Sequence, residues 1–436
     1  MSKSQQKISV VWFTTNLRIH DNLSLNQAIE SNQSVVGLYI LDSNIFDREQ
    51  FGFRKTGKFR ANFILESLRD LREQLAKLNI PLAVYQCDPI SAFQKLESQF
   101  PIATVYHQAE WTSEELHSIA QAQQALGKQT SFIQSYSQFL FHPDDIPFRA
   151  SEIPEVFTEY RKACEKSSKP RLTIEPQIPS APSLSVKHDE IPSLGSMGYD
   201  PIVAVAHSAF PFKGGESAAI ARLEDYVTRS KKVGVYKKTR NGLVGVDYSS
   251  KFSPWLAAGA LSPRTIYETV KQFETDEFSN QSTYWLIFEL IWRDYFKYIS
   301  LKHRDKIFRR SGIRERHYEW DSDRETIIRW TKGETPDEFV NANMIELAKT
   351  GWMSNRGRQN VASYFAKQLK LDWRIGAAYF ESLLLDYDVH SNYGNWMYVS
   401  GVGNDPRDRK FNTKLQADRY DPTGQYRRLW LQPTLF

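Results

Sequence analysis

The stretch from Gly351 to Asn404 decides the fold of this chain, because it gathers polar and aromatic residues in an otherwise helical region. It reads Ser354-Asn355-Arg356-Gly357-Arg358-Gln359, then Leu371-Asp372-Trp373-Arg374, then Asp386-Tyr387-Asp388, and finally Asn392-Tyr393-Gly394-Asn395-Trp396. Helical cores rarely bury Asn, Arg and Asp beside tryptophan, since an unpaired buried polar group is costly. The pattern therefore predicts a cavity that holds a large, polar and aromatic ligand.

The first 135 residues alternate between strand and helix patterns. Short apolar runs predict strands at 9–13, 35–41, 82–86, 104–106 and 131–133. Residues 59–78 carry apolar side chains at helical spacing. This alternation predicts a parallel sheet covered on both faces. No G-x-G-x-x-G follows the first run, so a Rossmann dinucleotide site is not expected there.

Prolines and serines dominate from Lys166 to about Ala209, which is typical of a connector. After Gly214-Gly215-Glu216 the pattern becomes helical, with helices expected at 218–228, 263–274, 284–301, 324–332, 345–350, 358–370 and 375–386. We therefore expect an α/β parallel-sheet domain at 1–135, an interdomain linker at 136–209 and an all-α domain at 210–436.

The composition limits the kinds of function. The 436 residues include 26 Phe, 21 Tyr and 11 Trp, and the net charge is +5, with the basic excess in the C-terminal half. The two cysteines, Cys87 and Cys164, lack metal-ligand spacing, so we expect no metal site and a reducing compartment. Residues 1–9 are polar and no run of eighteen apolar residues occurs. We expect a cytoplasmic protein without a membrane span.

The segments quoted from Gly351–Asn404 resemble the flavin-binding region of the photolyase/cryptochrome family, most closely its DASH branch. The resemblance implies FAD as cofactor and blue-light-driven repair of cyclobutane pyrimidine dimers. In that reaction light excites reduced FAD, an electron passes to the dimer, the ring splits and the electron returns. The resemblance covers nearly the whole chain, and its domain order matches the one expected above.

The hydroxyl-rich segment Tyr248-Ser249-Ser250-Lys251-Phe252-Ser253-Pro254 opens a helix, which alone favours plain N-capping over an anion site. The resemblance instead implies that this segment and Tyr236 hold the FAD diphosphate, which Arg293 approaches. It also implies that Arg358 pairs with Asp386 at the isoalloxazine, that Asp388 bonds the polar edge of the ring, and that Asn392 faces N5. Asp386 and Asp388 alone could suggest a cation site, but further oxygen ligands are lacking. The residues expected to bind the cofactor are Tyr236, Ser249, Ser250, Lys251, Phe252, Ser253, Arg293, Asn355, Arg358, Asp386, Asp388 and Asn392.

The resemblance assigns the substrate side to Glu289, Trp292, Asn355, Gln359 and Tyr398. Glu289 would hydrogen-bond the damaged bases and Trp292 would form a wall of the lesion pocket. Six-four photolyases have two histidines at the positions where this chain has Asn355 and Gln359. Because histidine would act there as a general acid, six-four chemistry is not expected. Duplex-acting photolyases usually have Met where this chain has Gln359 and Trp where it has Tyr398. Losing a stacking platform forfeits roughly 1–3 kcal/mol, similar to the cost of extruding a dimer from duplex. We therefore expect a preference for single-stranded or locally open DNA, and a monomer.

Trp396, Trp373 and Trp320 match the three tryptophans that carry electrons to the flavin in this family. Without the resemblance, three core aromatics would be the simpler interpretation. Glu110 stands where DASH relatives use a glutamate for a methenyltetrahydrofolate antenna, which makes that antenna an expectation. Thr14 and Asn16 replace an Arg and an Asp that photolyases usually carry, so an ion pair is lost there.

Two further functions fit the same residues. The chain could be a flavin blue-light photoreceptor or DNA-binding regulator without repair. Alternatively, it could bind nucleic acid and use flavin only structurally. Glu289 discriminates among them, because a sensor has no need of a carboxylate that bonds thymine carbonyls.

Overall fold

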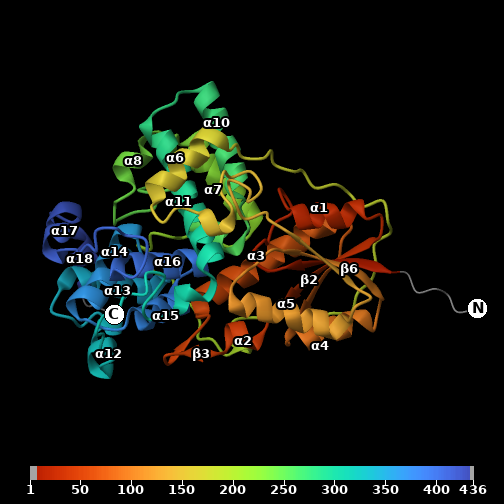
Figure 1. Cartoon of the computed structure of the whole chain (residues 1–436), viewed down its shortest axis with the longest axis horizontal. Helices are drawn as coiled ribbons and strands as arrows, with labels where there is room; N and C mark the ends of the chain where they lie inside the picture. The colour runs from red at the N-terminus through yellow and green to blue at the C-terminus, as the bar shows by residue number, and fades with distance from the viewer. Residues whose placement is uncertain (1–6, 433–436) are drawn as a thin grey trace, which may run out of the picture.

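The computed structural model describes residues 7–432 and places an α/β part beside a helical part (Figure 1). The first six residues of the polar start lie outside the described residues. The sheet has five strands, and every neighbouring pair is parallel. Their order across the sheet is β5 (Leu82–Tyr85), β2 (Ser34–Ile40), β1 (Ile8–Phe13), β6 (Ile102–Gln108) and β7 (Ser131–Ser135). All six β1 residues are buried, as expected for an inner parallel strand with both faces covered.

Helices cover both faces of this sheet. The helices α1 (Leu23–Glu30) and α3 (Lys58–Lys77) pack on one face, where they form a core with Val11 and Phe13. On the other face, α4 (Pro89–Glu97) and α5 (Ser113–Leu126) pack around Val10 and Trp12. The short helix α2 (Ser43–Phe46) and the hairpin β3 (Glu49–Gln50) and β4 (Phe53–Arg54) follow β2. The predicted α/β class is confirmed.

The helical part contains α6 to α18. Their bounds are α6 (Phe157–Ser167), α7 (Glu216–Glu224), α8 (Tyr236–Thr239), α9 (Ser253–Ala258), α10 (Pro263–Asp276), α11 (Gln281–His303), α12 (Arg324–Lys332), α13 (Glu338–Thr350), α14 (Asn355–Ser363), α15 (Trp373–Leu383), α16 (Val389–Ser400), α17 (Thr413–Tyr420) and α18 (Gln425–Leu431). π-Helical turns extend α7 over Asp225–Arg229 and α14 over Tyr364–Gln368.

The segment 136–209 is not a linker throughout. Phe139, Phe157, Tyr160 and Cys164 are buried in the same core as the helical part. The proline-rich run after α6 crosses the surface toward the sheet and back, mostly without helix or strand apart from a 3₁₀ turn at Gly195–Met197 (Figure 1). The helical part therefore begins earlier than 210, because the first half of this segment carries aromatic residues that need a core.

A tight contact joins the α/β part to the turn between α9 and α10. The buried Arg18 donates through Nη1 to the Gly259 oxygen at 2.8 Å, and Arg264 pairs with Asp21 at 2.6 Å. A Cβ on Gly259, where φ is +69°, would lie 1.8 Å from the Thr15 oxygen, so only glycine fits. Asn16 is fully buried here and its Oδ1 accepts from the Thr14 nitrogen at 2.9 Å. The Thr14 and Asn16 replacements therefore lie at the contact between the two parts.

Candidate functional site

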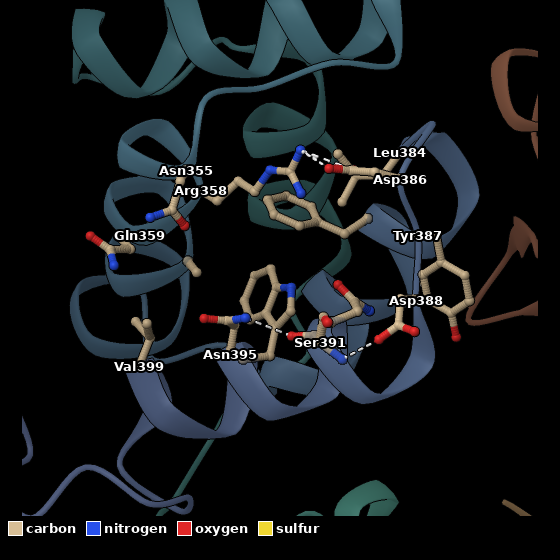
Figure 2. Close-up of a pocket in the computed structure, with 14 residues that line it drawn as sticks. Asn355, Arg358, Gln359, Leu384, Asp386, Tyr387, Asp388, Ser391, Asn395 and Val399 are labelled. Carbon is tan, nitrogen blue, oxygen red and sulfur yellow. Dashed lines mark hydrogen bonds and ion pairs between the residues drawn. The ribbon is translucent and has the colours of Figure 1, made fainter. Parts of the chain in front are cut away.

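Two adjoining cavities open between α11, α14 and α16. The first is lined by α14, α15, α16 and the segment before α16 (Figure 2). The second extends from there past α8, α9 and α11 and encloses about 1090 Å³, part of it open to solvent. They form one continuous space because their walls share Asn355, Arg358, Asp386, Asp388 and Ser391. A space of this size suits a large cofactor rather than a metal ion or a small metabolite.

The helix α14 begins with a capped turn that fixes its polar side chains. The Ser354 hydroxyl accepts from the Gly357 nitrogen at 3.0 Å, as a Ser N-cap does. One turn on, Arg358 donates through Nε to the Met353 oxygen and pairs with Asp386 at 2.9 Å. Figure 2 shows this pair along one edge of the cavity. The predicted contact between Arg358 and Asp386 is therefore present.

Asp388 and Asn392 belong to the start of α16. The Asp388 carboxylate caps the helix by accepting from the Ser391 nitrogen at 2.7 Å, and it pairs with Lys297 of α11 at 3.0 Å. Burial alone would raise the pKa of Asp388, but the Lys297 charge holds it below its ordinary value. Asn392 donates to the Ala377 oxygen at 3.0 Å, so its own carbonyl oxygen is left for a ligand. This corner offers a permanent anion beside an amide acceptor.

The second cavity holds a lysine with unusual surroundings. Lys251 is 1% exposed at a φ of +66°, and its Nζ has no hydrogen-bond partner. The ammonium lies 3.1 Å from the Tyr248 ring centroid and 4.6 Å from that of Trp352. Burial lowers the pKa of Lys251 well below its ordinary value. A buried donor without a partner in a cavity wall fits a site that an anionic ligand completes.

The hydroxyl-rich segment around Lys251 does not cap a helix, although its sequence alone favours N-capping. The helix α9 starts only at Ser253 and has no side-chain cap. Ser249, Ser250, Phe252 and Ser253 line the second cavity together with Tyr236. Arg293 also lines it, but its guanidinium donates to the Gln138 oxygen at 2.6 Å and the Leu256 oxygen at 3.1 Å. All twelve predicted cofactor-binding residues thus line one or both cavities.

Glu289 lines the second cavity and forms an ion pair with Arg240. Burial raises the pKa of Glu289, while the Arg240 charge opposes this rise. On α14, Arg356 donates to the Gln359 oxygen at 2.8 Å and to the Asn241 oxygen at 3.0 Å. Because Arg356 occupies the Gln359 oxygen, the Gln359 amide nitrogen remains as the available donor.

Trp292 and Tyr398 form an aromatic corner outside the two cavities. Their ring centroids lie 6.1 Å apart and the planes are perpendicular at 90°. Trp292 also stacks on Phe157 of α6, with ring centroids 3.6 Å apart and 12° between the planes. Sequence reasoning missed Phe157, since it falls in the segment predicted to be a linker. Its burial beside Trp292 could be found only from the fold.

The three predicted relay tryptophans lie on neighbouring elements. Trp396 packs against Gly376 of α15, one turn after Trp373, where a Cβ would lie 2.2 Å from the indole. Trp373 donates to the Arg310 oxygen at 3.0 Å, and Arg310 in turn contacts Trp320. The backbone next to Trp320 pairs with the backbone next to Trp373: the Asp372 backbone nitrogen donates to the Asp321 backbone oxygen at 2.8 Å.

A fourth tryptophan, Trp330 of α12, was not predicted to take part. Its ring centroid lies 6.3 Å from that of Trp396, and the side chain is fully buried. Sequence spacing gives no sign of this contact, since the two residues are far apart along the chain. Trp330 could therefore exchange an electron with Trp396.

Glu110 does not line either cavity and lies in the α/β part near Lys297 of α11. Its carboxylate accepts from Thr15 at 3.1 Å and from Gln108 at 2.9 Å. Burial raises its pKa, opposed by the charge of Lys297. Lys297 thus pairs with Asp388 at the cavity, and its charge also opposes the rise in the pKa of Glu110.

Comparison with known proteins agrees with this geometry. The family model described as "DNA photolyase" matches residues 9–182, and "FAD binding domain of DNA photolyase" matches residues 285–435. A Cryptochrome DASH of Gloeobacter violaceus is 47% identical over 98% of this chain and 85% of its own length. One of Danio rerio is 43% identical over 99% and 84%. The crystal structure of a Synechocystis sp. PCC6803 cryptochrome matches with a TM-score of 0.93 and 42% identity, covering 98% of this chain and 89% of the other.

A two-part fold with a polar cavity among the C-terminal helices defines a flavoprotein of the photolyase architecture. The chain belongs to the photolyase/cryptochrome family and, within it, to the DASH cryptochromes. Its cofactor is FAD, which fits the continuous cavity, its unpartnered Lys251 donor and its Asp388 anion. In the described part of the chain, no helix is long and apolar enough to cross a membrane.

Proposed function

We propose that this protein repairs cyclobutane pyrimidine dimers in blue light and prefers single-stranded or locally unpaired DNA. The observation that carries the proposal is Glu289, a half-buried carboxyl in the wall of the cofactor cavity. An ionised Glu289 accepts from a base N–H, and a protonated one donates to a base carbonyl. A protein that only senses light needs no such group at this place.

The chain's own residues divide the work between cofactor and substrate. When bound, reduced FAD supplies a light-absorbing one-electron donor. Arg358, Asp386 and Asp388 orient it, and Asn392 offers an acceptor at the ring. Glu289 and Gln359 hydrogen-bond the extruded bases, while Trp292 and Tyr398 provide the aromatic corner. Trp320, Trp373 and Trp396 bring electrons inward to keep the cofactor reduced.

The preference for single strands follows from the chemistry of Gln359 and Tyr398. Tyr398 gives less stacking area than the Trp that duplex-acting photolyases usually carry, and each base–aromatic stack contributes roughly 1–3 kcal/mol. Gln359 replaces an apolar Met contact with a polar amide. Extruding a dimer from duplex costs a few kcal/mol, and less from a single strand. Three basic side chains lie next to this region: Lys237 over the Trp285 ring, Arg240 paired with Glu289, and Arg356 bonded to Gln359. Their charges suit a phosphate backbone.

Several finer properties belong to the same proposal. We propose a monomer with a methenyltetrahydrofolate antenna at Glu110. A cytoplasmic or otherwise reducing compartment is consistent with Cys87 and Cys164, which are both free thiols.

Glu289→Ala tests the repair function. We expect the variant to bind FAD, to undergo photoreduction at the wild-type rate and to lose dimer repair by about 100-fold or more, as when a key hydrogen-bonding group is removed. The matched control is Glu277→Ala, which breaks an exposed ion pair with Lys231 outside the cavities. Wild-type repair by Glu289→Ala would favour the photoreceptor function instead.

A further inference from the structure

The relay residue Trp320 has an aromatic neighbour nearer the surface. The ring centroids of Tyr318 and Trp320 lie 5.3 Å apart, with 35° between the planes. Trp320 is 9% exposed, whereas Tyr318 is half-buried. Tyrosine is the other side chain that readily gives up one electron, so an electron could reach Trp320 from this ring.

The Tyr318 hydroxyl already has a proton acceptor. It donates to Asp408 Oδ2 at 2.9 Å. The Asp408 carboxylate is held against Gly401, the residue that follows α16, where a Cβ would lie 2.0 Å from Oδ1. It also pairs with Lys367, whose ammonium lies 4.6 Å from the Tyr318 ring centroid. Donor and acceptor are therefore fixed relative to each other.

We propose that Tyr318 is the terminal electron donor of the tryptophan relay and that Asp408 accepts its proton. The proposal rests on the relay of the proposed function, which leaves Trp320 one electron short after light absorption. One electron then moves from Tyr318 to this oxidised Trp320. The phenolic O–H bond breaks and a new O–H bond forms on Asp408. The products are neutral Trp320, a neutral tyrosyl radical and a protonated Asp408 carboxyl.

The surrounding charges permit this transfer. Lys367 and Arg316 are the cations that face the pair. Although burial alone would raise the pKa of Asp408, Lys367 and Tyr318 hold it below its ordinary value. An oxidised phenol is a much stronger acid than a carboxylic acid, so even this weakened base takes the proton. Recombination then requires the proton to return as well, which prolongs the separated charge.

A second tyrosine lies along the relay and is the rival donor. The Tyr393 ring centroid is 6.1 Å from that of Trp373, but Tyr393 is only 3% exposed. Its hydroxyl reaches Glu381 only at 3.5 Å, and Glu381 is already paired with Lys55 at 3.3 Å. A reductant in solution can refill Tyr318 far more easily than Tyr393.

Flash excitation of the holoprotein with oxidised FAD tests the proposal, with radicals followed by transient absorption and electron paramagnetic resonance. We expect Tyr318→Phe to remove the tyrosyl signal and to shorten the life of the separated charges about tenfold or more. Asp408→Asn should slow tyrosyl formation about tenfold. Tyr393→Phe should resemble wild type. So should the control Tyr284→Phe, which loses a hydroxyl bound to Glu165 at 2.7 Å away from the relay.

Two results would overturn the proposal in distinguishable ways. A tryptophan radical whose lifetime is unchanged in Tyr318→Phe, or is shortened only in Tyr393→Phe, would refute the terminal donor alone. No tryptophan radical in the wild type would remove the relay as well.

A flavin-free measurement tests the hydrogen bond itself. In apoprotein with ¹³C-labelled tyrosine, the Cζ resonance of Tyr318 is assigned as the one that disappears in Tyr318→Phe. The Asp408→Asn change should shift that resonance. An unshifted resonance would contradict the bond on which the proton transfer depends.

Discussion

Replacing Arg358 with alanine tests how the cofactor cavity works. The Arg358 guanidinium is 23% exposed, the Asp386 carboxylate is 3% exposed, and they meet at 2.9 Å. Removing one partner of a fully buried pair costs roughly 3–5 kcal/mol. Because the guanidinium is partly solvated, we expect the flavin-free protein to lose about 2 kcal/mol of unfolding free energy. The lost contact with FAD should cost about 2 kcal/mol more, a roughly 30-fold weaker Kd.

The chain offers a close control for this change. Arg427 is 27% exposed and pairs at 3.0 Å with Asp421, which is 2% exposed, outside both cavities. Arg427→Ala should cause a similar loss in urea unfolding but leave the Kd for FAD, measured by flavin fluorescence, unchanged. If Arg358→Ala binds FAD like wild type, or if both variants weaken binding equally, then Arg358 does not hold the cofactor.

Three further predictions concern the substrate, the relay and pH. The double change Gln359→Met/Tyr398→Trp should strengthen binding to dimer-containing duplex about tenfold, while a gain on single strands alone would refute the stacking argument. Trp373→Phe should abolish flavin photoreduction, whereas Trp330→Phe should retain it; the reverse result would route electrons through α12. Glu346 is buried, and its pKa is raised to about 7 by burial. Since the folded pKa exceeds the unfolded one, its favourable contribution is present at low pH and is lost as pH rises toward and through 7. Relative to wild type, Glu346→Gln should therefore gain up to about 3 kcal/mol in urea unfolding between pH 5 and pH 8, and a constant difference would contradict this.

Local patterns predicted much of the fold. The apolar runs gave the five strands within a few residues, and α12 was predicted with its observed bounds, since Asp323 caps one end and Gly333 the other. The start of α13 was missed because buried Asn343 interrupts its apolar pattern. That asparagine is satisfied within the helix by donating to the Phe339 oxygen at 2.7 Å. The helix α16 was not predicted because its polar residues line the cavity rather than solvent.

The site itself could be predicted only through the resemblance and only in part. Residues on one helical turn, such as Asn355 and Arg358, share a face by spacing alone. Contacts between distant elements carry no sequence signal: Arg240 with Glu289, Phe157 under Trp292, and Trp330 beside Trp396. Each depends on how helices pack, which hydrophobic periodicity does not specify.

The most direct test of the proposed function measures dimer loss from thymine-dimer oligonucleotides under blue light with the reduced, flavin-loaded protein. Single-stranded and duplex substrates are compared at the same salt concentration. We predict rapid repair of the single strand and little or none of the duplex. Bound, photoreducible flavin with no repair of either substrate would contradict the repair function.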